Sequence, residues 1–184
     1  MEKFPFARYI IHAHTDLGSP KDSVLTIDKY VKAAVRMGAK AISVTDHGTM
    51  YAVQPLYKAC KKHGIKLLVG CEFYVCESVE DMNRKKHTRL HLCGYAKDEA
   101  GYRALTRMVT ASNERILVIK TYDGDLSYPC ISKKILEKYV GPGSDGHGHV
   151  ILTSACVGGV LSGMSFANNG LKTDIEIIKE RIGK

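Results

Sequence analysis

The chain has 184 residues, of which 45% are hydrophobic, so it is long enough to form one globular domain with a substantial core. Its net charge of +8 favours polyanionic partners, either nucleic acid or phosphorylated metabolites, and does not decide between them. No apolar stretch is long enough to span a bilayer and no signal peptide is recognisable, so we expect a cytoplasmic location and no membrane partner.

The six cysteines are spread along the chain without a Cys-x-x-Cys pair, and several lie in apolar runs that are typical of strands. They occupy positions 60, 71, 76, 93, 130 and 156. We therefore expect buried, reduced thiols rather than a disulfide framework.

The predicted elements alternate between strand and helix from the N-terminus, a pattern typical of an α/β protein with parallel strands. A first strand is expected at residues 8–12. Apolar residues at helical spacing predict a helix over 26–38, with Thr26 as its N-cap. A short strand follows at 41–45, and a second helix is expected over 50–64.

The middle of the chain continues this alternation. Residues 65–77 read as one strand or a strand pair, and the basic segment 81–89 reads as a loop. A strand at 90–96 is followed by a helix over 98–114, for which Asp98 is the predicted N-cap.

The last third is less regular. Turn-forming residues dominate 116–148, interrupted by a short helix at 132–140, and the glycine-rich segment 141–149 reads as a mobile connection. A strand is expected at 150–155 and a final helix at about 171–182.

Two histidines stand one residue apart where the first strand ends. Alternate side chains of a strand point to the same face, so His12 and His14 would point to one place. This is a geometry that can bind a metal ion, although two solvated histidines in a polar turn explain the pattern as well.

Further potential ligands lie at or just past the ends of the other predicted strands. In a parallel α/β barrel these ends share one rim, so residues distant in sequence can converge there. Each has an ordinary structural explanation taken alone, such as a helix cap or a small core thiol, but their joint placement favours a shared site. They are Asp46, His47, Glu72, His91 and Cys156.

Several longer motifs carry a family resemblance. The stretches "HAHTDL", "AISVTDHGTMYAVQPLYKACKKHGIKLLVGCEFYV", "LHLCGYAKDEAGYRALTRMV" and "ILTSACVGGVL" occur in order over nearly the whole chain. Together they resemble the PHP domain (polymerase and histidinol phosphatase) of the bacterial replicative DNA polymerase III alpha subunit. The resemblance implies a single PHP domain over residues 1–184, folded as a distorted TIM-like (β/α)7 barrel with up to three metal ions at its C-terminal rim.

The resemblance also implies which residues bind these metals and act through them. The catalytic set, acting through bound metals, is His12, His14, His47 and Glu72. The full ligand set is His12, His14, Asp22, His47, Glu72, His91 and Cys156, with Asp16 competing with Asp22 for one position.

The sequence departs from the family pattern in one respect. The family completes its site with an Asp-x-His pair from a later strand, yet no histidine follows His149. We therefore expect a barrel that is incomplete at its C-terminal end. Whether the chain is a truncated piece or a small relative with an open barrel stays undecided at this point.

Mixed imidazole, carboxylate and thiolate ligands suit zinc, manganese or iron better than calcium. Two or three such ions can clamp a phosphate during an in-line displacement. For a polymerase-associated domain the expected reaction is 3′ to 5′ hydrolysis at a DNA 3′ end, with polymerase domains of the same or a companion chain as partners. Basic residues expected to contact the phosphate backbone are Lys21, Arg84, Lys85 and Lys86.

Two other functions remain open from the sequence. The chain could be a small-molecule phosphatase of the histidinol phosphate type, or a non-catalytic scaffold stabilised by metal. The four remaining histidines are not expected in the site, because they lie in loops or at a helix end. They are His63, His87, His147 and His149.

Overall fold

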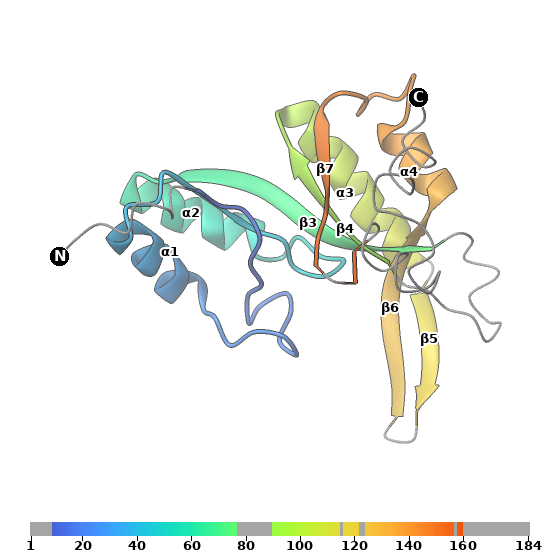
Figure 1. Ribbon diagram of the computed structural model, residues 1–184, viewed down its shortest axis with the longest axis horizontal. Helices are drawn as coiled ribbons and strands as arrows, with labels where there is room; N and C mark the ends of the chain where they lie inside the picture. Colours follow the sequence, from blue (N-terminus) through green and yellow to red (C-terminus); the bar gives the residue numbers. More distant parts are fainter. Residues whose placement is uncertain (1–8, 77–89, 115, 122–123, 157, 160–184) are drawn as a thin grey trace, which may run out of the picture.

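The computed structural model shows a mixed α/β fold built around one long curved strand (Figure 1). The described residues are 9–76, 90–114, 116–121, 124–156 and 158–159. The elements up to the long strand are β1 (Tyr9–Ile10), α1 (Ile27–Arg36), β2 (Ala41–Val44), α2 (Val53–His63) and β3 (Lys66–Cys76). Those that follow are β4 (Leu90–Ala96), α3 (Glu99–Glu114), β5 (Ile116–Thr121), β6 (Gly124–Ser132), α4 (Lys133–Val140) and β7 (Val150–Ser154).

The N-terminal half is a parallel sheet packed against two helices. β1 pairs with β2, and β2 pairs with the first half of β3, all in parallel. The predicted N-cap of α1 is confirmed, because the Thr26 side chain accepts a hydrogen bond from the backbone N–H of Lys29. Gly64 ends α2 in the left-handed region, at φ 66°. Val31, Ile42 and Leu56 are among the buried residues that join helices and sheet in one core.

The long strand β3 changes neighbours along its length. Its first half pairs with β2, and at Tyr74 it pairs with His91 of β4 on one edge and Cys130 of β6 on the other. Between these regions His47 forms an isolated parallel bridge with Glu72. The strand order is therefore β1-β2-β3-β4-β7, with β6 beside the far end of β3.

The prediction of parallel strands is wrong for β4 and β7, whereas β6 pairs with β3 in parallel. β4 runs antiparallel to β3, and β7 runs antiparallel to β4. A parallel neighbour would need a crossover connection, usually a helix that covers the sheet. β4 instead lies beside β3 in the opposite direction. As a result, the first residues of β4, rather than its last, lie beside the end of β3.

A β-hairpin occupies a region for which the sequence reading gave only turns. β5 and β6 pair antiparallel from Ile116 opposite Pro129 to Thr121 opposite Gly124, and the hairpin extends away from the rest of the chain (Figure 1). The overlooked signal is the dipeptide Asp123-Gly124, of the kind that marks turns in a sequence.

The C-terminal half has its own core, in which α3 packs against β3, β4 and β6. Phe73, Leu105 and Ile131 are fully buried there. Asp98 is confirmed as the N-cap of α3, because its Oδ1 accepts a hydrogen bond from the backbone N–H of Gly101 at 3.0 Å. The short helix predicted at 132–140 is also confirmed, and Ser132 caps it.

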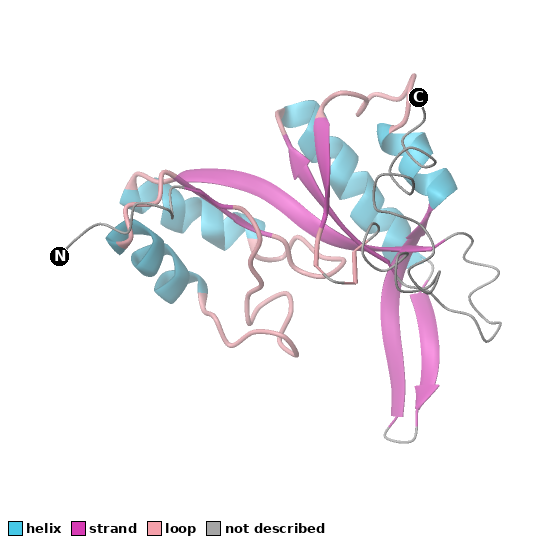
Figure 2. Cartoon of the chain, viewed as in Figure 1, coloured by secondary structure: helices cyan, strands magenta, loops and turns pink. Residues whose placement is uncertain are grey.

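The α/β class is confirmed, and the described strands form an open, curved sheet with β1 and β7 at its two ends, as expected of an incomplete barrel (Figure 2). The helix expected at 171–182 lies outside the described residues. Within the described part of the chain, no helix combines the length and the apolar surface needed to cross a membrane.

Candidate metal centre

The buried carboxylate of Glu72 lies at the junction between the two halves of the sheet and faces four histidines. Its side chain is only 1% exposed. Glu72 Oε2 lies 3.3 Å from a ring nitrogen of His14, 3.6 Å from one of His12 and 3.8 Å from one of His47. Glu72 Oε1 lies 2.5 Å from His91 Nδ1. The structure thus brings together five of the seven predicted ligands around one carboxylate.

Backbone pairing explains why residues 12–14 and 47 reach Glu72. The N–H of Thr45 donates to the carbonyl of Ala13 at 2.8 Å, which continues the β1–β2 pairing past the end of β1. The N–H of Gly48 donates to the carbonyl of Glu72, also at 2.8 Å. These bonds bring the ends of β1 and β2 to the middle of β3.

The β3–β4 ladder supplies the remaining groups. Glu72 lies opposite Cys93, and Tyr74 lies opposite His91. Residues two apart on a strand, and residues directly opposite each other, share a face of the sheet. His91, at the start of the strand predicted over 90–96, therefore reaches the site because the antiparallel β4 starts beside the end of β3.

Three buried polar atoms in this cluster have no hydrogen-bond partner among the described residues: His14 Nδ1, His47 Nδ1 and Glu72 Oε2. Buried polar atoms in folded proteins are nearly always hydrogen-bonded, so three such atoms in one cluster require an explanation. The rings of His14 and His47 stack with their centroids 4.4 Å apart. Two imidazole nitrogens and a carboxylate oxygen are suitable ligands for a divalent metal ion, so the residues present fit such an ion.

Three overlapping groups of side chains could each hold an ion, since their ligand atoms lie within 4.8 Å of one another. Glu72 belongs to all three groups. The groups are His14, His47 and Glu72; then Glu72, His91 and Cys156; and finally His12, Glu72 and Cys93. Nitrogen, oxygen and sulfur ligands in this mixture suit borderline transition metals.

Cys93 is a potential ligand that the sequence reading missed. Its Sγ lies 3.3 Å from His12 Nδ1, and burial followed by the charge of Glu72 raises the pKa of its thiol to about 12 in the metal-free chain. The available signal was the His91-x-Cys93 spacing on one strand. It places both side chains on one face by the same alternation that drew attention to His12 and His14.

The charge states in the cluster suit cation binding. Burial lowers the pKa of His12 and of His47, although the nearby Glu72 charge opposes the shift, so both rings favour the neutral form that binds metals. Burial alone would raise the pKa of Glu72. The hydrogen bond to His91 and the surrounding histidines outweigh burial and lower this pKa, which keeps the carboxylate charged.

The other predicted residues differ in how exposed their side chains are and in what they contact. Asp22 is half exposed and its Oδ2 lies 3.2 Å from His47 Nε2, so of the two competing aspartates it is the one with a described contact to the cluster. Cys156 is exposed, with its Sγ 3.6 Å from His91 Nδ1. Asp46 is buried, and its two oxygens accept hydrogen bonds at 2.7 Å from the backbone N–H and the hydroxyl of Thr15. Asp46 therefore holds the loop after His14 in place.

The basic residues expected to contact phosphate divide into two sets. Lys21 lines a cleft of about 300 Å³ that borders His47. Arg84, Lys85 and Lys86 lie outside the described residues.

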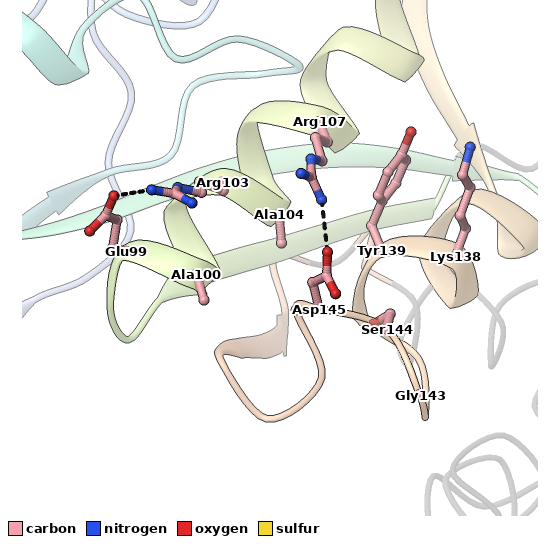
Figure 3. Close-up of a pocket in the computed structure, with 11 residues that line it drawn as sticks. Glu99, Ala100, Arg103, Ala104, Arg107, Lys138, Tyr139, Gly143, Ser144 and Asp145 are labelled. Atoms are coloured by element: carbon pink, nitrogen blue, oxygen red, sulfur yellow. Dashed lines mark hydrogen bonds and ion pairs between the residues drawn. The ribbon is translucent and has the colours of Figure 1, made fainter.

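A larger cavity, of about 620 Å³, lies between α3, α4 and the segment that follows α4 (Figure 3). Charged residues line it, and four of them form two ion pairs. Arg103 bonds Glu99 at 2.5 Å, and Arg107 lies 3.3 Å from Asp145. None of the predicted site residues is among its described lining residues.

Comparison with known protein families matches residues 11–184 to the PHP domain. The chain belongs to the PHP family. The resemblance drawn from the "TDHG" and "GCEFY" motifs is thereby confirmed. This PHP-family chain is 34% identical over 152 residues to the DNA polymerase III subunit alpha of Campylobacter jejuni, covering 83% of the chain and 11% of that protein.

A second relative carries the same name. The DNA polymerase III subunit alpha of Helicobacter pylori strain 26695 is 32% identical over 159 residues, covering 86% of this PHP-family chain and 12% of the relative. The chain thus spans only a small part of the length of the curated relatives it matches. Among solved structures, an amidohydrolase from Chromobacterium violaceum has a TM-score of 0.41 and 20% identity, covering 59% of this chain and 34% of that one.

Proposed function

We propose that this chain is a metal-dependent phosphoesterase domain whose cluster around Glu72 holds two or three divalent ions, zinc, manganese or iron. The observation that carries the proposal is the set of buried, unpartnered atoms, His14 Nδ1, His47 Nδ1 and Glu72 Oε2. A bound ion would give Glu72 Oε2 and a histidine nitrogen of the group His14, His47 and Glu72 the partners that they lack among the described residues.

The proposed ligands are those already grouped by geometry, with Glu72 shared between ions and Asp22 at the edge beside His47. When bound, such ions lower the pKa of a coordinated water and withdraw charge from a phosphate oxygen. The protein holds its ligand rings in fixed orientations. Thr45 Oγ1 is hydrogen-bonded to His12 Nδ1 at 2.8 Å, which turns Nε2 of that ring toward Glu72.

The proposed reaction is the hydrolysis of DNA phosphodiesters from a 3′ end, of the 3′ to 5′ exonuclease type. Two observations support this substrate. The relatives at 34% and 32% identity are subunits of a DNA polymerase, and the net charge of +8 favours a polyanion. Lys21, beside His47 in the cleft, is a proposed phosphate contact, as are Arg84, Lys85 and Lys86. The proposed partners are polymerase domains of the same or a companion chain.

Two alternatives make different predictions. A phosphatase of the histidinol phosphate type would use the same metals on a small monoester. A non-catalytic scaffold would bind metal for stability only. Both keep the metal cluster, so metal content alone does not separate them from the proposed activity.

The test is hydrolysis by the purified 184-residue chain loaded with manganese or with zinc. A 3′-labelled oligonucleotide and histidinol phosphate are supplied in parallel, with Glu72→Gln as the inactive control. The proposal expects metal-dependent nucleotide release that exceeds histidinol phosphate hydrolysis and disappears in Glu72→Gln. A reversed preference would favour the metabolite phosphatase. Metal binding with neither activity would favour the scaffold.

A further inference from the structure

A cleft of about 300 Å³ adjoins the metal cluster, and two tyrosines are among its lining residues. The loop 18–22 forms one wall, residues 127–129 of β6 form the other, and His47 and Tyr74 lie at its base. Ligand pockets usually measure roughly 300 to 1,000 Å³, so this cleft suits one small unit, such as a single nucleoside.

Aromatic rings connect the cluster to the outer wall of this cleft. The rings of His47 and Tyr74 stack, with centroids 5.2 Å apart and an interplanar angle of 9°. Tyr74 in turn contacts Tyr128 edge to face, with centroids also 5.2 Å apart. Tyr74 is 9% exposed and forms the base, whereas Tyr128 is half-buried and belongs to the wall. A phosphate held at the cluster would therefore have its attached group beside two tyrosines.

Both walls are held in place by close packing against the residues around His47. Gly48 has φ +61°, and a Cβ at this position would collide with Pro129, the residue after Tyr128. A Cβ at Gly18 would collide with the Asp46 side chain in the same way. β6 is also paired with β3, with Tyr74 opposite Cys130. The cleft is thus a preformed feature whose position relative to the cluster is fixed.

We propose that this cleft is a nucleoside subsite, in which Tyr128 contacts the base of the nucleotide whose phosphate lies at the cluster. The inference rests on the proposed function, because it takes the phosphate to bind at the metals. Aromatic rings bind bases with little sequence preference, since every base has a π face. Lys21, which lines the opposite wall, adds a positive charge that favours a phosphate group of the same strand.

The test measures binding to the zinc-loaded chain by titration calorimetry, so that no turnover is needed. Thymidine monophosphate and inorganic phosphate are the two probes. The variants are Tyr128→Leu, which keeps apolar volume without a ring, and Tyr128→Phe, which keeps the ring. Tyr57→Leu, at an exposed tyrosine on α2, is the matched control.

We expect thymidine monophosphate to bind more tightly than phosphate. Tyr128→Leu should lower the affinity for the nucleotide on the order of tenfold, within the range of one base contact, and leave the affinity for phosphate unchanged. Tyr128→Phe and Tyr57→Leu should bind as the parent does, with unchanged zinc content. Equal binding of the two probes, or equal loss of both in Tyr128→Leu, would overturn it. Nucleotide binding that depends on Tyr128 without any hydrolysis would refute the proposed activity alone.

Discussion

Two cavities in the described part of the chain differ in whether the polar groups around them have partners. The cavity between α3 and α4 has about twice the volume of the cleft beside the histidine cluster, 620 Å³ against 300 Å³. Four of its charged groups are exposed and form two ion pairs with each other, as in the pair of Arg107 and Asp145. The smaller cleft is lined by His47, which belongs to the cluster whose three buried atoms have no partner in the described structure. Unsatisfied buried groups, and not cavity volume, therefore identify the site that requires a ligand.

The largest expected effect is the loss of metal from the cluster in His14→Ala. The variant removes one of the two stacked rings that face Glu72, so bound metal should fall by at least one ion per chain in elemental analysis. Hydrolysis should fall by more than the roughly 10- to 100-fold that loss of an outer-shell partner causes. The control is His63→Ala, at the end of α2. Unchanged metal content in His14→Ala would show that the unpartnered buried atoms beside the smaller cleft do not mark a metal site.

A smaller effect is expected from Thr45→Val, which keeps the shape of a fully buried side chain but removes its hydroxyl. The hydrogen bond to His12 Nδ1 is lost, so that ring is less well oriented toward Glu72. Metal affinity should fall by roughly 10- to 100-fold with secondary structure retained. The measurement is competition with a chelator, followed by circular dichroism. An affinity equal to that of the parent chain would show that the hydroxyl does not position His12.

The thiol that the sequence reading missed provides a third test. Cys93→Ser should weaken the binding of one ion while leaving the others, because only one of the three ligand groups includes Cys93. Cys60→Ser, in the core between α1 and α2, should bind metal as the parent does. Metal stoichiometry and affinity for each variant separate these outcomes. If both serine variants bind metal equally well, the group of His12, Glu72 and Cys93 holds no ion.

The smallest effect is expected at the larger cavity. Arg107→Ala breaks an exposed pair with Asp145, and such pairs contribute only about 0 to 1 kcal/mol to stability. Chemical denaturation should show a change within this range, with metal content and hydrolysis unchanged. A marked loss of either would mean that the α3–α4 cavity contributes to the activity.

Short-range sequence patterns, such as helix caps, allowed much of the fold to be predicted. They did not predict whether neighbouring strands pair parallel or antiparallel. The cap at Thr26 and the glycine at Gly64 mark helix ends through short-range backbone geometry, and both predictions are confirmed. The direction of β4 depends on how a distant segment returns to β3, which no local pattern specifies. The hairpin β5–β6 did have a local signal, Asp123-Gly124, that was overlooked among other turn residues.

The candidate site also has features that short-range sequence patterns predicted and features that they did not. The His12-x-His14 spacing predicted two rings at one place, and both lie against Glu72. His91 was predicted to join them as part of a parallel barrel, but it arrives through an antiparallel strand. Cys93 followed from the same alternation that identified the two histidines and was not considered. The unpartnered nitrogens could not be predicted, because they depend on how side chains from separate strands pack together.

The most direct test of the central claim is a crystal structure of the chain grown with zinc, with the ions located by anomalous scattering. The account predicts at least one strong peak bound by His14, His47 and Glu72, with zinc to nitrogen distances of about 2.0 to 2.1 Å. Peaks confined to other histidines, such as His147 and His149, with none beside Glu72, would contradict it.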